Sequence, residues 1–519
     1  MTNPLSLIPY PLQVRFLDGT FAWSDQLSIN AGLAPAEISL FLDALPRELR
    51  PQLQDGSENS WFRVHYDSAL KQESYELRIL PEQRIEIMTA NAQGLFYALQ
   101  SLRQLILAEY QPGIHSVSLP CVHIIDEPRF AWRGFMLDEA RHFQGSQTVK
   151  DLLDWLAVLK MNVFHWHLSD DQGWRIEIQQ YPHLIEVAAK RSASQISGFL
   201  GKKINQTPHS GFYTQDEIKE IIQYAAARHI RIVPEIEMPG HALAALAAYP
   251  SLGCSGGPYQ VTPHWGIHAD ILCAGKPGTT TFLENVLDEV MHLFPGDFIH
   301  TGGDEAPKTR WRHCPDCQNL ARDTGVTRIN DLQTVLTNRI SLFLRARGRT
   351  LIGWNEMLAE KLVPDAVVQY WVGKEKTLLQ HIRSGRKAIL SNFAAYYLDH
   401  SYAHSSLDKV YQYEPVFDRL ESEYQQNILG IETPLWTEFV PSRQRLDWQV
   451  FPRLLAVAET AWLQPDKKDL SSFHQRLTPF LNQLDAKNVG YALLSDANPA
   501  FIKRLSGPLT LLQAGQGMR

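Results

Sequence analysis

The stretch FIHTGGDE, residues 298 to 305, is the part of the chain from which the rest can be ordered. A short apolar run leads into a histidine and two glycines, and two adjacent carboxylates, Asp304 and Glu305, follow. This pattern is typical of a buried strand that ends at a functional rim. Two neighbouring carboxylates repel each other when both are ionised, so their pKa values tend to separate into one proton donor and one anion. The alternative is a solvated acidic pair that caps the following helix.

Around this stretch, apolar runs of strand length alternate with helical segments, which predicts parallel β/α units. One helix is expected to begin after Thr214, because Thr214 and Glu217 have the spacing of a capping box. Eight units favour a closed (β/α)₈ barrel over an open sheet. The eight predicted strands are residues 133–138, 162–168, 231–237, 297–300, 350–356, 366–371, 387–392 and 428–432.

A barrel of this kind collects its functional side chains at the carboxyl ends of the strands. Acidic residues and tryptophans follow the predicted strands in this chain. They include Asp138, Asp170, Asp171, Trp174, Glu235, Glu237, Asp304, Glu305, Trp354, Glu356, Trp371, Asp399, Trp436 and Glu438. The sequence therefore predicts an acidic, aromatic rim at one end of the barrel.

The chain divides into three predicted regions. Residues 1–126 form an α+β domain with a hairpin over 74–88 and a helix over 94–107, and they contain no cluster of acids or bases. We therefore expect a structural, non-catalytic role for this domain. Residues 127–490 form the barrel, and residues 491–519 form a C-terminal tail or peripheral helix.

Carboxylates beside flat aromatic rings suit a sugar, because the rings pack on the C–H faces of a pyranose and the acids bind its hydroxyls. Cleavage of a glycosidic bond needs a proton donor and stabilisation of a cationic ring carbon. Consecutive side chains of an extended segment point in opposite directions. Asp304 and Glu305 would then be poorly placed as the usual pair of acid and nucleophile, and the substrate itself would supply the nucleophile.

Several motifs in order resemble the family 20 glycoside hydrolases, the β-N-acetylhexosaminidases. The motifs are HTGGDE (300–305), RGFMLD (133–138), FHWHLSDDQGW (164–174), EMPGH (237–241), GWNE (353–356), YLD (397–399) and WTE (436–438). The resemblance spans nearly the whole chain. It implies an exo-acting enzyme that removes terminal N-acetylglucosamine or N-acetylgalactosamine from glycans, with retention and through an oxazolinium intermediate.

The same resemblance implies a role for each catalytic residue. Glu305 would protonate the leaving oxygen and then activate water, while Asp304 would orient the acetamido N–H. Tyr397 would donate to the acetamido oxygen. Asp170 and His241 would form a relay behind Glu305.

It also implies how the terminal sugar is bound. Three residues would bind its hydroxyls and three tryptophans would wall the pocket: Arg133, Asp399 and Glu438, and Trp354, Trp371 and Trp436. Arg133 has an alternative place in an ion pair at the bottom of the barrel. Glu237 stands where Asp is common in the family, and a further wall tryptophan is not evident, with Tyr402 or Tyr411 as the candidate substitutes.

Other interpretations of the chain stay open at this stage. His165 and His167 have the spacing of a metal-dependent amidohydrolase, although no matching histidines follow. A carbohydrate-binding protein on an inactive barrel would need loss of the proton donor, and Glu305 is present. Neither a cofactor nor a metal is expected.

The composition of the chain limits the classes of molecule that it can bind. A net charge of -7 gives nucleic acid no broad basic surface. Neither a secretory leader nor a membrane span is recognised, which predicts a cytoplasmic protein, with a homodimer among the open oligomeric states. Among five cysteines, a bridge between Cys254 and Cys273 is left open. The CPDC run at 314–317 has the spacing of half a zinc site, but no second half is recognised, so packing at a helix end is favoured for this run.

Overall fold

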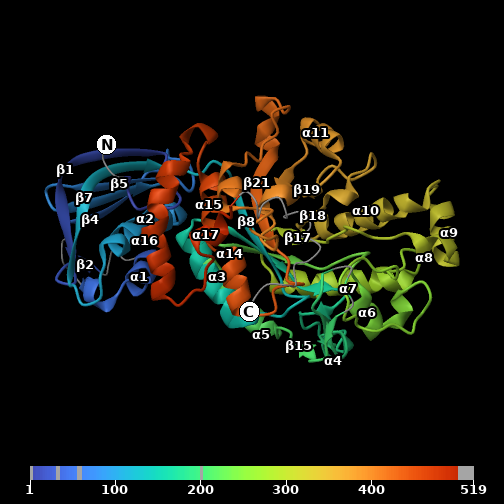
Figure 1. The fold of residues 1–519 in the computed structure, drawn as a ribbon. Helices are drawn as coiled ribbons and strands as arrows, with labels where there is room; N and C mark the ends of the chain where they lie inside the picture. Colours follow the sequence, from blue (N-terminus) through green and yellow to red (C-terminus); the bar gives the residue numbers. More distant parts are fainter. Residues whose placement is uncertain (1–3, 31–35, 55–60, 199–200, 202, 501–519) are drawn as a thin grey trace.

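The computed structural model describes residues 4–30, 36–54, 61–198, 201 and 203–500. An N-terminal sheet domain lies at one side of a closed barrel, and helices from the end of the chain pack where the two meet (Figure 1). The predicted fold class is confirmed. Residues 501–519, which belong to the predicted tail, lie outside the described residues.

The N-terminal domain is built on a five-stranded sheet. Its order is β1 (Gln13–Ser24), β7 (Ser116–Asp126), β5 (Tyr75–Leu80), β6 (Arg84–Thr89) and β4 (Phe62–Tyr66). Strands β5 and β6 pair antiparallel, so the predicted hairpin is confirmed. Helix α2 (Ala92–Glu109) begins after Asn91, whose side chain accepts the Gly94 N–H, and it packs against β5, β6 and β7. The domain also contains α1 (Ala36–Asp43), β2 (Ser28–Asn30) and β3 (Gln52–Gln54).

All eight predicted barrel strands are present, and they pair in parallel around a closed ring. They are β8 (Trp132–Asp138), β9 (Val163–His167), β16 (Arg231–Glu235), β17 (Phe298–His300), β18 (Thr350–Trp354), β19 (Val367–Tyr370), β20 (Ala388–Leu390) and β21 (Ile428–Leu435). The predicted capping box opens α5 (Gln215–Ala226), where Thr214 and Glu217 exchange hydrogen bonds. Further helices of this part of the chain are α3 (Ser146–Val158), α7 (Pro277–Leu293), α10 (Leu332–Arg345), α11 (Glu375–Arg383), α13 (Leu407–Gln412), α14 (Arg443–Val450), α15 (Arg453–Trp462) and α16 (Leu470–Ala486).

Shorter elements fill the connections at the mouth. The long connection from β9 to α5 contains α4 (His183–Glu186) and paired two-residue strands: β10 (Ser169–Asp170) with β11 (Gly173–Trp174), β12 (Lys190–Arg191) with β15 (His209–Ser210), and β13 (Ser194–Gln195) with β14 (Ile204–Asn205). The others are α6 (Leu243–Ala248), α8 (Thr309–His313), α9 (Pro315–Asp323), α12 (Phe393–Tyr396) and, near the end, α17 (Leu494–Ala497). None of the helices in the described part of the chain has both the length and the apolar character of a bilayer span.

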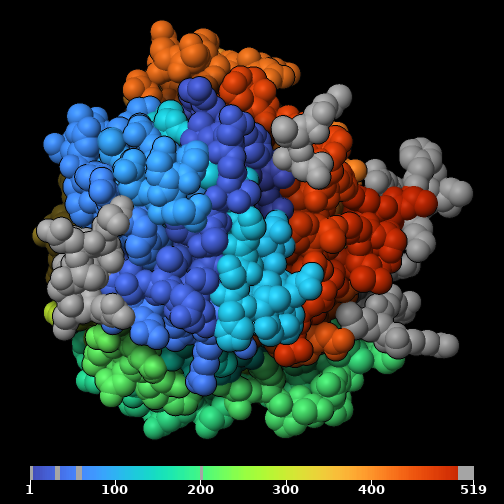
Figure 2. Space-filling view, turned by 90° about the vertical axis from the view of Figure 1, so that its left-hand side faces the viewer, coloured from blue at the N-terminus to red at the C-terminus, as the bar shows by residue number. Residues whose placement is uncertain are grey.

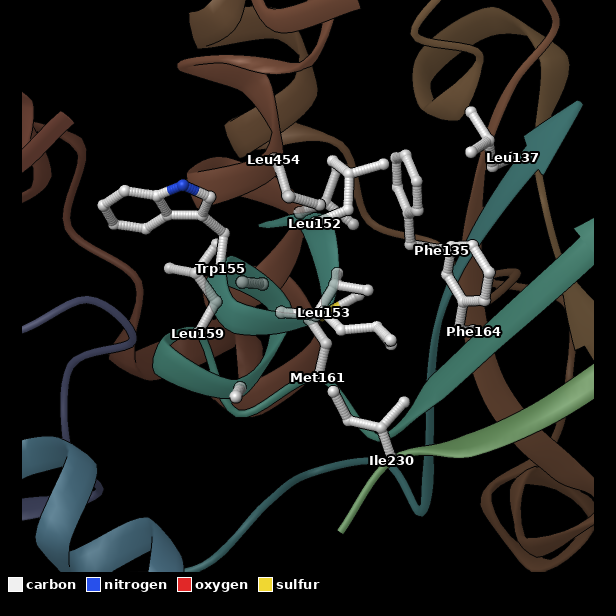
Figure 3. Close-up of a cluster of buried hydrophobic side chains, with 14 of the residues drawn as sticks. Phe135, Leu137, Leu152, Leu153, Trp155, Leu159, Met161, Phe164, Ile230 and Leu454 are labelled. Atoms are coloured by element: carbon white, nitrogen blue, oxygen red, sulfur yellow. The ribbon is translucent and has the colours of Figure 1, made fainter. Parts of the chain in front are cut away.

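The barrel has an apolar shell and a layered interior. Outside the strands, Phe135 and Phe164 stack with centroids 6.4 Å apart and belong to the same buried cluster as the leucines of α3 (Figure 3). Inside, an apolar plug that includes Trp132 and Val163 fills the lower end. Above the plug, charged side chains replace apolar ones, so the interior grades from a hydrophobic floor to a polar mouth.

Buried polar contacts join the N-terminal domain to the barrel. Asp126, at the end of β7, pairs with Lys160 at 2.9 Å, and both side chains are fully buried. Asp126 also accepts hydrogen bonds from Trp462 of α15 and from Tyr75 of β5. A buried ion pair holds only when its remaining atoms are satisfied, as they are here. In the space-filling view, the N-terminal domain and the C-terminal helices form one continuous surface (Figure 2).

Candidate active site

The turn after β17 directs the two adjacent acids. Gly302, Gly303 and Glu305 have φ values of 60°, 100° and 42°, in the left-handed region. A Cβ at Gly302 would lie 1.7 Å from Glu237 Oε2, so only glycine fits. The segment is therefore not extended, and the expectation that the two carboxylates point in opposite directions is wrong. Non-glycine residues in this region carry strain that is often found at functional sites.

Both acids reach one imidazole. His241 Nε2 lies 3.6 Å from Asp304 Oδ2 and 3.6 Å from Glu305 Oε2. On its other side, His241 Nδ1 lies 3.1 Å from Asp170 Oδ1 and 3.2 Å from Asp171 Oδ2. His241 is itself left-handed, with φ 49°. The structure thus brings together all four residues predicted for the acid and its relay.

Burial and neighbouring charges set the protonation of this group. Burial lowers the pKa of His241, but Asp170 and Asp304 outweigh it and raise the pKa well above its usual range. Burial raises the pKa of Asp304 to about 6, against the opposing effect of His241. Burial, and then Asp304, raise the pKa of Glu237 well above its usual range. At neutral pH the array therefore contains an imidazolium, an ionised Asp304 and a neutral Glu237.

Four aromatic side chains surround the space beside the acids. Trp354 and Trp436 lie with ring centroids 5.8 Å apart, and Trp371 stacks on Tyr397 at 6.1 Å. Trp371 Nε1 donates to both oxygens of Glu356 at 3.1 Å. Burial raises the pKa of Glu356 to about 7. Glu356 thus supports the wall from behind.

Two further acids lie across the mouth. Burial, and then Glu438, raise the pKa of Asp399 to about 8. Burial also raises the pKa of Glu438, against the opposing charge of Arg141. The Oδ1 atoms of Asp304 and Asp399 are buried and have no hydrogen-bond partner among the described residues. Buried acceptors without a donor are costly, so these oxygens are suited to the donor groups of a ligand.

The histidines of β9 belong to a buried ionic network below the mouth. His165 lies between Glu432 at 2.7 Å and Glu235 at 3.1 Å, while His167 lies between Glu235 and Asp170. Burial lowers the pKa of His165, but Glu432 and Glu235 raise it to about 9. For His167, Glu235 outweighs burial and the pKa rises to about 10. Both ring nitrogens of each histidine face carboxylates, so an internal ionic network accounts for the two residues without a metal.

Residues 130–465 match the family model "Glycosyl hydrolase family 20, catalytic domain", and residues 5–127 match "Glycosyl hydrolase family 20, domain 2". The chain belongs to glycosyl hydrolase family 20. The resemblance found in the sequence motifs is thereby confirmed.

Relatives of known name agree with this assignment. A β-hexosaminidase of Porphyromonas gingivalis is 37% identical over 94% of this chain, and the match spans 64% of that longer protein. The structure of a family 20 exo-β-N-acetylglucosaminidase from Vibrio harveyi, in complex with N-acetylglucosamine, superposes with a TM-score of 0.85 at 31% identity, covering 95% of this chain and 80% of that one. A β-N-acetylhexosaminidase from Bacteroides fragilis gives 0.82 at 35% identity, covering 95% and 99%.

Within the family 20 barrel, Arg133 does not lie at the sugar-binding mouth, and that prediction is wrong. Arg133 is the second residue of β8, at the opposite end of the barrel, and it is fully buried. Its guanidinium donates to Glu73 at 2.8 Å, to the Tyr97 hydroxyl at 2.9 Å and to the Phe130 and Lys160 carbonyls. The alternative of a barrel-bottom ion pair is correct, and the pair joins the two family 20 domains.

The arginine at the mouth is Arg141, just beyond the carboxyl end of β8. It pairs with Asp170 at 2.8 Å and lies over the Trp436 ring at 5.0 Å. Burial lowers the pKa of Arg141, but Asp170, Asp138 and Glu438 raise it well above its usual range. The position of Arg141 could have been predicted, because the functional side chains of such barrels lie at the carboxyl ends of the strands.

The proposed substitutes for the missing wall tryptophan are also wrong. The Tyr402 hydroxyl is buried and donates to the Trp448 and Phe451 carbonyls. Tyr411 stacks on Phe473 of α16 and donates to Glu459. Neither ring therefore faces the acids. The remaining family departure, Glu237, uses its extra methylene to reach beneath the glycine turn, where its Oε2 accepts the Gly303 N–H at 3.4 Å.

Proposed function

We propose that this chain is an exo-acting β-N-acetylhexosaminidase that removes terminal N-acetylglucosamine or N-acetylgalactosamine with assistance from the substrate. One observation carries the proposal: two carboxylates, Asp304 and Glu305, share the imidazole of His241 at a mouth lined by Trp354 and Trp371. Family membership and the names of the relatives support the same activity.

In the first step, Glu305 gives its proton to the leaving oxygen while the acetamido oxygen of the substrate attacks the anomeric carbon. The glycosidic bond breaks and an oxazolinium ring forms. Asp304 accepts the acetamido N–H on its unpartnered oxygen and offsets the positive charge of the ring. Tyr397 donates to the acetamido oxygen, and Trp436 donates in turn to the Tyr397 hydroxyl, which leaves the phenolic proton free.

In the second step, Glu305 takes a proton from water, and the resulting hydroxide attacks the anomeric carbon. The carbon–oxygen bond of the oxazolinium ring breaks, and the sugar is released with retained configuration. His241, held by Asp170, presents a positive charge to Glu305 in both steps. Asp170 and His241 are thus positioning residues rather than proton donors to the substrate.

The outer hydroxyls of the terminal sugar meet polar groups. Arg141 replaces Arg133 as the donor at this end of the site, and Asp399 and Glu438 lie across from the catalytic acids. A wall of polar groups that binds the outer hydroxyls of one sugar favours exo action, because a continuing chain would have those hydroxyls substituted.

Aryl glycosides test the proposal directly. We expect hydrolysis of N-acetylglucosaminide or N-acetylgalactosaminide but not of the plain glucoside, and strong inhibition by a thiazoline analogue of the intermediate. Equal cleavage of the plain glucoside would overturn acetamido participation. Brief treatment with a chelator should leave the rate unchanged.

Leaving groups test the acid. Glu305→Gln should lower kcat/KM, which reports the step that breaks the glycosidic bond, by about 10²–10⁴-fold on an alkyl glycoside and far less on a dinitrophenyl glycoside, which needs little protonation. Asp304→Asn should slow both substrates. Glu360→Gln, an exposed position on the surface, serves as the control. Equal losses on the two leaving groups in Glu305→Gln would refute its role as acid.

A further inference from the structure

Four of the five cysteines come together outside the active site. Cys273 Sγ lies 3.5 Å from Cys317 Sγ and 3.7 Å from Cys314 Sγ, and Cys254 Sγ lies 3.9 Å from Cys317 Sγ. All four sulfurs lie within 4.8 Å of one another. The CPDC run thus has the second half that the sequence did not reveal.

These separations fit a tetrahedral metal centre. A disulfide would need about 2.05 Å between sulfurs, and the structure has all five cysteines as free thiols. A tetrahedron with Zn–S bonds of about 2.3 Å has S–S edges of about 3.8 Å, which is close to the three measured distances. Packing in a hydrophobic core does not by itself require four cysteine sulfurs to converge on one point.

The local backbone is also built for such a centre. Cys314 and Cys317 have the two-residue spacing of a zinc-binding turn, and both lie at the start of α9, where the helix dipole favours thiolates. The Gly275 N–H is directed at the sulfurs of Cys273 and Cys317. A Cβ at Gly275 would lie 2.2 Å from the Asp316 carbonyl carbon, so the two segments touch backbone to backbone.

The surroundings of the cluster exclude water on most sides. Cys273, Cys314 and Cys317 are buried in a small apolar cluster of their own with Trp311 and Ile271, separate from the main core. Trp311 Nε1 donates to the Leu272 carbonyl and so joins α8 to the segment of chain that carries Cys273. Cys254 is half-buried and closes the outer side.

We propose that Cys254, Cys273, Cys314 and Cys317 bind one Zn²⁺ ion as a structural site. The four thiols lose four protons on binding, and the four thiolates fill the tetrahedral coordination shell. No position stays open for water or substrate, so the ion takes no part in hydrolysis.

The site connects the two segments that hold the catalytic group. Cys254 and Cys273 belong to the connection after β16, which also carries His241, and Leu272 N donates to the Pro239 carbonyl at 2.9 Å. Cys314 and Cys317 belong to the connection after β17, which carries Asp304 and Glu305. The metal would therefore fix the distance between the imidazole and its two acids from outside the mouth.

Metal analysis of the full-length chain tests the proposal. After dialysis against EDTA, we expect about one zinc per chain, with X-ray absorption showing four sulfur neighbours at about 2.3 Å. Cys314→Ser/Cys317→Ser should lose the zinc, and Cys121→Ser should keep it, because Cys121 lies buried in the N-terminal domain. A mercurial titration of the unaltered protein should release the zinc as the thiols react, which tests the site even if the double variant fails to fold.

Other results would overturn the assignment. A chain that folds and turns over with less than about 0.1 metal per chain, or with the thiols paired as disulfides, excludes the site. One iron per chain with visible thiolate-to-iron absorption would refute zinc as the metal. Zinc retained in the double variant would place the metal elsewhere.

Discussion

Substituting the two arginines near β8 separates stability from catalysis. Arg133→Ala would remove a fully buried guanidinium and leave Glu73 and two carbonyls without their donors. Breaking a buried pair from one side costs about 3–5 kcal/mol. We expect the free energy of unfolding to fall by that amount while kcat and KM stay within about twofold at temperatures where the variant is folded.

Arg141→Ala should have the opposite profile. Hydrogen bonds to charged groups contribute about 1.5–3 kcal/mol, which corresponds to a loss of roughly 10- to 150-fold in kcat/KM. Urea titration followed by tryptophan fluorescence and the hydrolysis of a nitrophenyl N-acetylglucosaminide measure the two quantities. The conservative variants Arg133→Lys and Arg141→Lys should show smaller effects of the same kind. An Arg133→Ala variant with unchanged unfolding and a tenfold loss in kcat/KM would refute the reasoning.

Three further outcomes follow from the geometry of the mouth. Asp304 must be ionised to act, and burial raises its pKa to about 6. We therefore expect kcat/KM to fall tenfold per pH unit below about pH 6. A pH profile of kcat/KM that is flat down to pH 4.5 would contradict this. Gly302→Ala should abolish activity in a hydrolysis assay. Gly348 also has a left-handed φ, of 73°, but has open space around it, so Gly348→Ala should cost only about 1–2 kcal/mol of stability in a urea titration. Asp170→Asn should lower kcat about 100-fold with a smaller change in KM, because the imidazolium of His241 loses the anion that stabilises it. An unchanged kcat would exclude the relay.

The barrel could be predicted from the sequence because each strand is a short, continuous apolar run between turn residues. Once the strands were assigned, the residues that follow each strand could be placed at the rim without further information. The place of Arg133 did not, since a strand of seven residues spans about 23 Å and its two ends face different surroundings. Motif similarity assigned the sugar hydroxyls to Arg133, which lies at the start of β8, whereas Arg141 lies just beyond the end of that strand.

Other parts of the site depend on backbone geometry that residue types do not reveal. The left-handed φ of Glu305 turns two consecutive carboxylates toward one imidazole, against the alternation expected of an extended segment. The four cysteines meet because two long connections fold against each other, and no local spacing links Cys254 and Cys273 to the CPDC turn. Long-range packing of this kind is absent from local sequence patterns.

The ion pair between Asp126 and Lys160 has a consequence for expression of the barrel without the N-terminal domain. A chain that begins after residue 126 would lose Asp126, the counter-ion of Lys160, and Tyr75, one of the two aromatic rings against the Lys160 ammonium, and would keep only Trp462. The border between the two family models falls beside this buried ion pair, so cutting the chain there would remove the partner of Lys160 and uncover the surface that the N-terminal domain buries.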